Sequence, residues 1–127
     1  MKTILLAFLL QAQPPASAGQ TGWIEIYSAQ DGTRAYYDPA SIERGEGTVR
    51  VRMRALPGGE IGKSVREFVA IEEFNCARRT TTTRALTAEL QDGQRMEVPP
   101  DGRVDAVHAN TPAAALFDRV CTAAPTV

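Results

Sequence analysis

The segment that decides the fold covers residues 64–76 and reads Ser-Val-Arg-Glu-Phe-Val-Ala-Ile-Glu-Glu-Phe-Asn-Cys. It is the longest run with strand character, because β-branched and aromatic side chains recur between charged ones. The alternation is imperfect, since Phe68 adjoins Val69 and Glu72 adjoins Glu73. We therefore expect a strand with one packed face and one partly solvated face, and either a β-bulge or cover on both faces.

The preceding segment, residues 48–56, has the clearest pattern of a half-buried strand, because apolar and basic residues alternate strictly. The two sets are Val49, Val51, Met53 and Ala55 on one face, and Arg50, Arg52 and Arg54 on the other. This pattern predicts a core-facing apolar side and a solvent-facing arginine side.

Turn signals delimit the remaining strands. Asp31-Gly32 and Asp92-Gly93 are hairpin signals. Pro39 cannot continue a strand ladder, so we expect the chain to turn at residues 38–42. The other expected strands cover residues 23–27, 33–37, 80–90 and 94–98, with a loop over 57–63 and an irregular crossing over 103–110. Without repeats or a second domain, the chain reads as one α+β domain with about six strands.

A helix is expected near the C-terminus. Thr111 can cap its first amides, and Pro112 fits the first helical position because its missing N–H costs nothing there. The apolar stripe predicted to face the sheet consists of Leu116 and Val120, joined by Phe117 and Ala113.

The N-terminus has the features of a secretory signal peptide over residues 1–18, with the mature domain over 19–127. Lys2 precedes an apolar run over 4–10, and small residues at 16–18 form a cleavage site. The run is too short to span a bilayer, although an uncleaved anchor is the competing interpretation. We expect export to the periplasm or cell surface, with no membrane insertion after cleavage.

Cys76 and Cys121 are the only cysteines. In an exported protein a pair of cysteines favours a disulfide, and closing a loop of this length contributes roughly 4 kcal/mol in the chain-entropy account. Two buried free thiols or a metal site are the alternatives. Two cysteines and a single, distant His provide too few ligands for a metal site, so no metal is expected.

Composition argues against several functions. The formal net charge is −1 and aromatic residues make up 6% of the chain, which favours neither nucleic acid nor an anionic membrane surface. The only histidine, His108, lies in the irregular crossing, and Glu72 and Glu73 should face opposite sides of a strand. We therefore expect no enzymatic activity, no catalytic residues and no cofactor.

Basic residues are the best candidates for a protein-binding surface. Three guanidinium groups on one strand face could grip carboxylates or sulfated sugars. The candidates are Arg50, Arg52, Arg54, Lys63, Arg66, Arg78 and Arg79. In the alternative interpretation the arginines of residues 48–56 form a solvated face and pair across strands with Glu25, Glu67 or Glu89.

The order of these features resembles the surface-adhesin protein E-like family of bacterial exported domains. The matching residues are Trp23, Tyr36-Tyr37-Asp38, Ser41-Ile42, Glu72-Glu73-Phe74-Asn75-Cys76, Arg78-Arg79, Thr111-Pro112, Leu116 and Val120-Cys121. The resemblance implies an antiparallel sheet of about six strands with a C-terminal helix held against it by a Cys76–Cys121 bridge. The family namesake is a surface protein that binds host matrix and serum proteins and can dimerise. Its adhesive segment is similar to residues 60–84, where Lys63 and Arg66 align with its basic residues.

The resemblance and the residues together lead to one functional expectation. The chain should be a non-enzymatic envelope domain that acts through a protein partner, with adhesion to matrix proteins as the specific role. A periplasmic structural or inhibitor module is the main alternative, and a small hydrolase is a weaker one. A homodimer is a further option for this chain.

Overall fold

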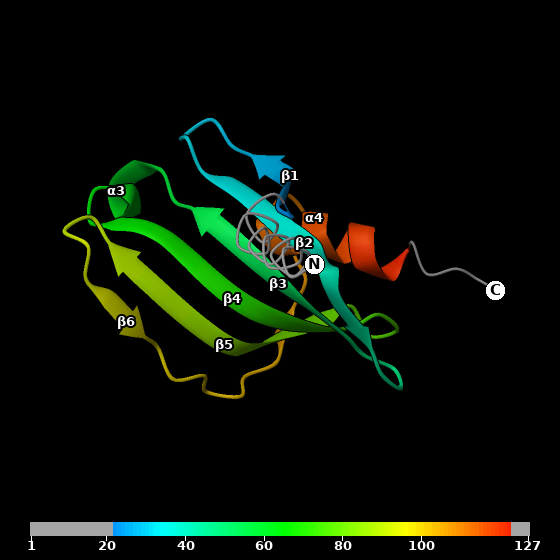
Figure 1. Ribbon diagram of the computed structural model, residues 1–127. Helices are drawn as coiled ribbons and strands as arrows, with labels where there is room; N and C mark the ends of the chain where they lie inside the picture. The colour runs from blue at the N-terminus through cyan, green and yellow to red at the C-terminus, as the bar shows by residue number, and fades with distance from the viewer. Residues whose placement is uncertain (1–21, 123–127) are drawn as a thin grey trace, which may run out of the picture.

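The computed structural model describes residues 22–122. The expected signal peptide over 1–18 lies outside the described residues. Six strands form an antiparallel sheet in which each strand pairs with the next one in sequence. They are β1 (Ile24–Ser28), β2 (Arg34–Arg44), β3 (Val49–Leu56), β4 (Val65–Asn75), β5 (Thr80–Leu90) and β6 (Arg95–Glu97). A further short strand, β7 (Asp105–Ala106), also pairs with β5. The helices are α3 (Gly59–Gly62) and α4 (Pro112–Cys121). Figure 1 shows α4 behind β2 on one side of the sheet, and this arrangement of one sheet and a packed helix is of the expected α+β class.

The predicted organising strand is β4, which pairs along its length with β3 on one side and β5 on the other. Its pairing with β5 shifts register at two places, with one extra residue in β4 between Val65 and Glu67 and one extra residue in β5 opposite the step from Ile71 to Glu72. The first shift is the bulge that was one of the two expectations for this strand. Val51 of β3 lies opposite Glu72, so Glu72 shares the core-facing side of the sheet and Glu73 points the other way. The adjacent pairs Phe68-Val69 and Glu72-Glu73 are therefore not bulges, because the β3–β4 ladder is regular from Phe74 to Phe68. The alternation is imperfect because apolar residues occur on both faces of β4.

The prediction for β2 was wrong at its C-terminal end. The strand does not stop before Pro39 but continues to Arg44, with its register to β3 interrupted between Asp38 and Glu43. The Ser41 hydroxyl donates to the Asp38 carbonyl at 2.7 Å and accepts from the Arg52 amide at 2.8 Å. A side chain thus replaces the ladder contacts that the proline disrupts, and the strand resumes beyond it.

Two short elements also differ from the sequence prediction. The expected loop over 57–63 contains the single turn α3, and the expected irregular crossing contains β7. At the start of α3, Gly59 has a φ of +60° and donates its N–H to the Asp31 carbonyl at 3.2 Å. β7 pairs with β5 through two residues only, too few to produce a recognisable sequence period.

The C-terminal helix begins as predicted. The Thr111 side chain accepts a hydrogen bond from the Ala114 amide at 3.1 Å, and Pro112 is the first helical residue. Leu116, Phe117 and Val120 are buried, which confirms most of the predicted stripe, whereas Ala113 is only half-buried. Burial of each large apolar side chain contributes about 1.5–3 kcal/mol.

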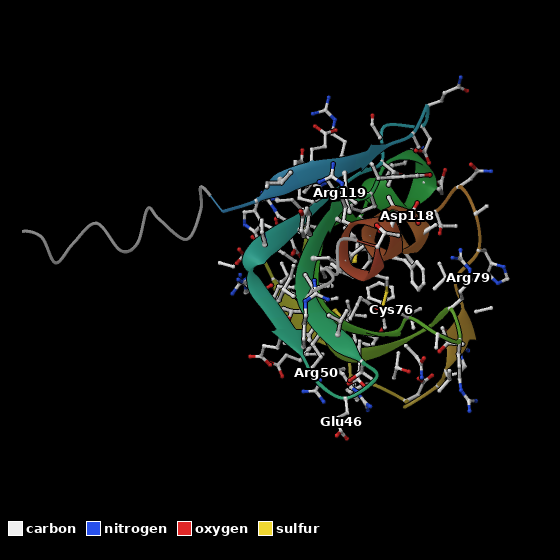
Figure 2. The ribbon with its side chains drawn as sticks, turned by 90° about the vertical axis from the view of Figure 1, so that its right-hand side faces the viewer. Glu46, Arg50, Cys76, Arg79, Asp118 and Arg119 are labelled. Carbon is white, nitrogen blue, oxygen red and sulfur yellow. A yellow bond between two sulfur atoms is a disulfide. The ribbon has the colours of Figure 1, made fainter. Side chains whose placement is uncertain are left out.

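The helix is joined to the central strand by the Cys76–Cys121 disulfide, with the two Cα atoms 5.5 Å apart. Beside the bridge, the rings of Phe74 and Phe117 meet edge to face with centroids 5.9 Å apart. Figure 2 shows α4 end-on inside the curve of the sheet, close to Cys76. The predicted fold class, with its tethered helix, is confirmed.

Candidate functional site

The arginines of β3 lie on the side of the sheet opposite the core. Val49, Val51 and Met53 are buried between them, so strict alternation exposes the basic set on the other side. We call Arg50, Arg52, Arg54 and the Arg84 of β5 the outer arginine face. The first three were predicted from the sequence, whereas Arg84 was not.

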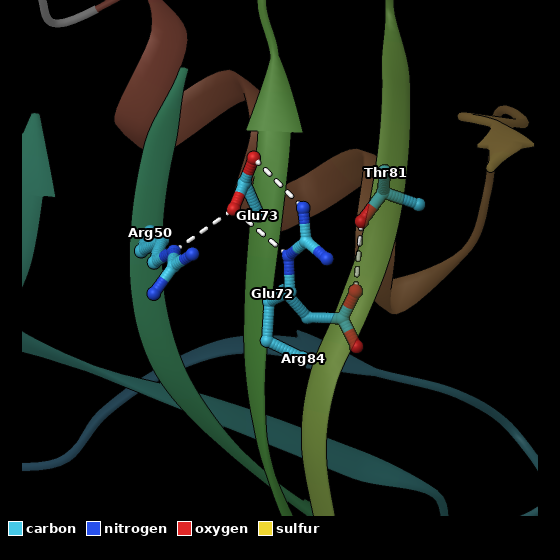
Figure 3. A network of polar contacts seen from close by, with 5 residues as sticks. All are labelled: Arg50, Glu72, Glu73, Thr81 and Arg84. Atoms are coloured by element: carbon cyan, nitrogen blue, oxygen red, sulfur yellow. Dashed lines mark hydrogen bonds and ion pairs between the residues drawn. The ribbon is translucent and has the colours of Figure 1, made fainter. Parts of the chain in front are cut away.

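Arg50 and Arg84 share one carboxylate, that of Glu73. The Arg50 Nε donates to Glu73 Oε1 at 2.8 Å, and the Arg84 Nε donates to the same oxygen at 3.0 Å. Figure 3 shows Glu73 on β4 held between the two guanidinium groups from the neighbouring strands. Hydrogen bonds from Arg84 and then Arg50 lower the pKa of Glu73 below its ordinary value. Two cations therefore face one anion here.

Arg52 is held by a carboxylate and an aromatic ring. Its Nη1 lies 3.4 Å from Asp38 Oδ2, and its guanidinium carbon lies 5.0 Å from the centre of the Trp23 ring. Side-chain accessibility remains 45%, so these contacts orient the group without burying it.

Arg54 follows the same arrangement one step along the strand. Its Nε donates to Glu67 Oε1 at 2.8 Å, and its guanidinium carbon lies 5.7 Å from the Tyr36 ring centre. Each arginine of the β3 stripe is thus positioned by one acidic partner.

The predicted acidic partners are correct only in part. Glu67 does pair with Arg54, but Glu25 and Glu89 are not the partners of the β3 arginines. Strand register gives the reason, because Glu73 lies directly opposite Arg50 and Asp38 directly opposite Arg52. Glu25 belongs to β1, from which β3 is separated by β2.

The remaining candidate residues do not form one patch with this face. Lys63 is exposed beside Glu60, with Nζ 3.5 Å from its Oε1. Arg66 lies 3.6 Å from Glu89 and donates to the Gln91 carbonyl at 3.1 Å. Both residues therefore sit at the β4 end opposite Cys76, away from Arg50 and Glu73.

Arg79 has a structural position beside the helix. Its guanidinium carbon lies 4.6 Å from the Phe117 ring centre, and its carbonyl accepts from the Val107 amide at 3.0 Å. Figure 2 shows Arg79 next to α4. The contacts of Arg79 therefore belong to the packing of the helix and the crossing segment.

Arg78 and Arg84 line a polar hollow of about 380 Å³ next to the shared carboxylate. The hollow is lined by Thr48, Glu73, Asn75, Arg78, Thr80, Thr82, Arg84 and Val104. Two guanidinium groups beside hydroxyl and amide donors can hold a carboxylate or sulfate. The sequence alone gives no signal for Arg84, because Glu73 lies opposite Thr82 and Arg84 is the extra residue of β5 at the register shift between Thr83 and Ala85.

Other candidates for chemistry are separated from one another. Glu72 and Glu73 serve opposite faces, and His108 is exposed. Among residues 22–122, no three His, Cys, Asp or Glu side chains gather closely enough to hold a metal ion. Across the same residues, no helix has the length and apolar character needed to cross a membrane.

The fold and bridge define a class of small domain in which an antiparallel sheet curves around a C-terminal helix joined by a disulfide to its central strand. Several solved structures share this fold. Crystal form II of Haemophilus influenzae protein E superposes with a TM-score of 0.60 at 16% identity, over 80% of this chain and 88% of that one. Protein E from non-typeable Haemophilus influenzae gives 0.52 at 16% identity, over 80% and 76% of the two chains.

The fold is therefore protein E-like, which confirms the structural part of the sequence resemblance. No protein-family model and no curated protein matches the sequence. Identity at this level shows a common fold, and activity has to be argued from the surface of this chain itself.

Proposed function

We propose that the protein is an exported, non-enzymatic domain that binds partner proteins through the outer arginine face, with adhesion to extracellular matrix as its role. Export is supported by the Cys76–Cys121 bridge, because disulfides persist in oxidising compartments. The leader-like residues 1–18 support the same location.

The observation that carries the proposal is the excess of positive charge around Glu73. Arg50 and Arg84 share its carboxylate, while Arg78 lines the same hollow without an ion pair within residues 22–122. A carboxylate or sulfate from a partner would complete the charge balance. Such a ligand would meet guanidinium groups that are already oriented, which lowers the entropy lost on binding.

The existing ion pairs leave these arginines available. Arg50 is 50% accessible, and exposed ion pairs contribute only about 0–1 kcal/mol. A ligand anion can therefore join or replace the internal partner at little cost. Because the contact is electrostatic and exposed, binding should weaken as salt increases.

The test uses the disulfide-bonded mature domain over residues 19–127, with immobilised heparin and a panel of matrix proteins as probes. Arg50→Ala and Arg78→Ala should each weaken binding about tenfold, which corresponds to about 1.4 kcal/mol. Arg95→Ala is the matched control, since Arg95 is exposed on β6 and does not line the hollow. Equal binding by the Arg50 and Arg95 variants would contradict the proposal.

Location on the cell is tested separately by adding protease to intact cells. Adhesion requires digestion of the native protein before the outer membrane is breached. Resistance until that point would favour a periplasmic structural or inhibitor module instead.

A further inference from the structure

The helix covers only part of the inner side of the sheet. It packs against β1 and β2 and against the Phe74 end of β4. The other half of β4, with its neighbours β3 and β5, leaves a groove of about 280 Å³ on the same side. The groove is lined by Met53, Ala55, Phe68, Ala70, Glu72, Thr83 and Leu86.

The lining is arranged in three rows across the strands. One row joins Ala55, Phe68 and Ala88, and the next joins Met53, Ala70 and Leu86. The third row joins Val51, Glu72 and Thr83. Consecutive rows are two residues apart along β4, or about 7 Å. The groove is therefore apolar over two rows and acidic at the third.

Glu72, at the acidic end of the groove, has different contacts from the glutamates that pair with arginines on the other side of the sheet. Glu72 accepts hydrogen bonds from the hydroxyl groups of Thr81 and Thr83, each at 2.7 Å, and Figure 3 shows the bond from Thr81. Within residues 22–122 it has no basic partner at ion-pair distance.

By contrast, three outer-face glutamates each pair with an arginine, and these are Glu67, Glu73 and Glu89. The two threonine hydroxyls fix the position of the Glu72 carboxylate without neutralising its charge. A fixed, uncompensated negative charge beside apolar surface favours a cation attached to an apolar group.

We propose that this groove docks a segment of a partner protein that places a large apolar side chain against Phe68 and Leu86 and a Lys or Arg at Glu72. An extended segment presents side chains on one face every two residues, about 7 Å apart, which matches the spacing of the rows. The groove is small and open, so it suits side chains from a larger molecule better than an enclosed small ligand.

This inference is independent of the proposed function, because it concerns the opposite side of the sheet. The two surfaces also select opposite charges, since the outer arginine face attracts anions and the groove attracts a cation. Their tests can therefore fail separately.

The experiment pans a phage library of random heptapeptides against the disulfide-bonded mature domain. Enriched peptides should carry a large apolar residue and a Lys or Arg two positions apart. The consensus peptide should bind Glu72→Gln at least tenfold more weakly than the wild type. Glu73→Gln, the adjacent position on the other face, should bind it as the wild type does.

A second pair of variants tests the apolar rows. Leu86→Asp should abolish binding of the consensus peptide, while Thr87→Asp, one residue along β5, should not. Retention of the bridge and a cooperative thermal transition would show that each variant is folded.

Three results would overturn the inference. The first is the absence of an enriched apolar-basic motif. The second is equal peptide affinity of the wild type and Glu72→Gln. The third is a wild-type dimer in sedimentation velocity that Leu86→Asp dissociates, because the occupant would then be a second copy of this chain.

Discussion

Glu72 and Glu73 are neighbours in sequence, yet their carboxylates serve opposite faces of the sheet. Glu73 joins Arg50 and Arg84 on the outer side, whereas Glu72 accepts from Thr81 and Thr83 on the inner side. The two glutamates therefore belong to two surfaces that favour ligands of opposite charge. One surface has an excess of guanidinium groups, and the other has a carboxylate without a basic partner in the described part of the chain.

Lowering the pH should destabilise the folded domain, partly because Glu73 becomes protonated. Its folded-state pKa is lowered, so its contribution to stability is present above the unfolded-state pKa and is lost as pH falls through the folded-state value. Because the arginines are half-exposed, that contribution is at most about 1 kcal/mol. Glu73→Gln should flatten the acid side of a plot of unfolding free energy against pH. An NMR titration should show the Glu73 pKa rising in Arg84→Ala, and no rise would contradict the shared-carboxylate arrangement.

Breaking the disulfide should destabilise the folded state by about 2–4 kcal/mol, because the bridge restricts the unfolded chain. The double substitution Cys76→Ser with Cys121→Ser should lower the midpoint of guanidinium unfolding accordingly. The reduced wild type is the control and should behave in the same way. Unchanged midpoints in both samples would show that the helix is held by packing alone.

Truncating the helix at the core should be more costly than truncating an exposed apolar residue. Phe117→Ala removes a buried ring that meets Phe74, and such changes cost about 3–5 kcal/mol. Ile61→Ala is the comparison, because Ile61 is exposed on α3 and should change stability by less than about 0.5 kcal/mol. Thermal unfolding of the two variants measures the difference, and similar losses would contradict the described core.

The hydrogen bond that caps the N-terminus of α4 should contribute less to stability than the buried Phe117 ring does. Thr111→Ala removes the acceptor for the Ala114 amide and should cost about 1 kcal/mol. Thr111→Ser keeps a hydroxyl group and should recover most of that loss. If urea unfolding gives the same unfolding free energy for the serine and alanine variants, the hydrogen bond does not stabilise the helix.

Much of the fold follows from local sequence signals. Alternation in β3 and the Asp-Gly turns define strands, while Thr111-Pro112 defines the start of α4. These signals depend on residues close together in the chain, so they can be interpreted without the structure.

The parts that were not predicted depend on pairing between distant residues. β2 continues past Pro39, where the Ser41 hydroxyl accepts from the Arg52 amide and pairing with β3 resumes at Glu43. The recruitment of Arg84 to the outer arginine face depends on the register of β5 against β4, including the bulge beside Glu72. A one-residue change in register reverses the face of every side chain, and the sequence pattern did not place the bulge at a single residue.

NMR mapping can show whether the outer arginine face is the binding surface. A sulfated heparin tetrasaccharide is titrated into the labelled, disulfide-bonded mature domain. We predict the largest shift changes at residues 48–54, at Glu73 and at residues 78–84. Changes confined to Lys63 and Arg66, or no changes at millimolar tetrasaccharide, would contradict it.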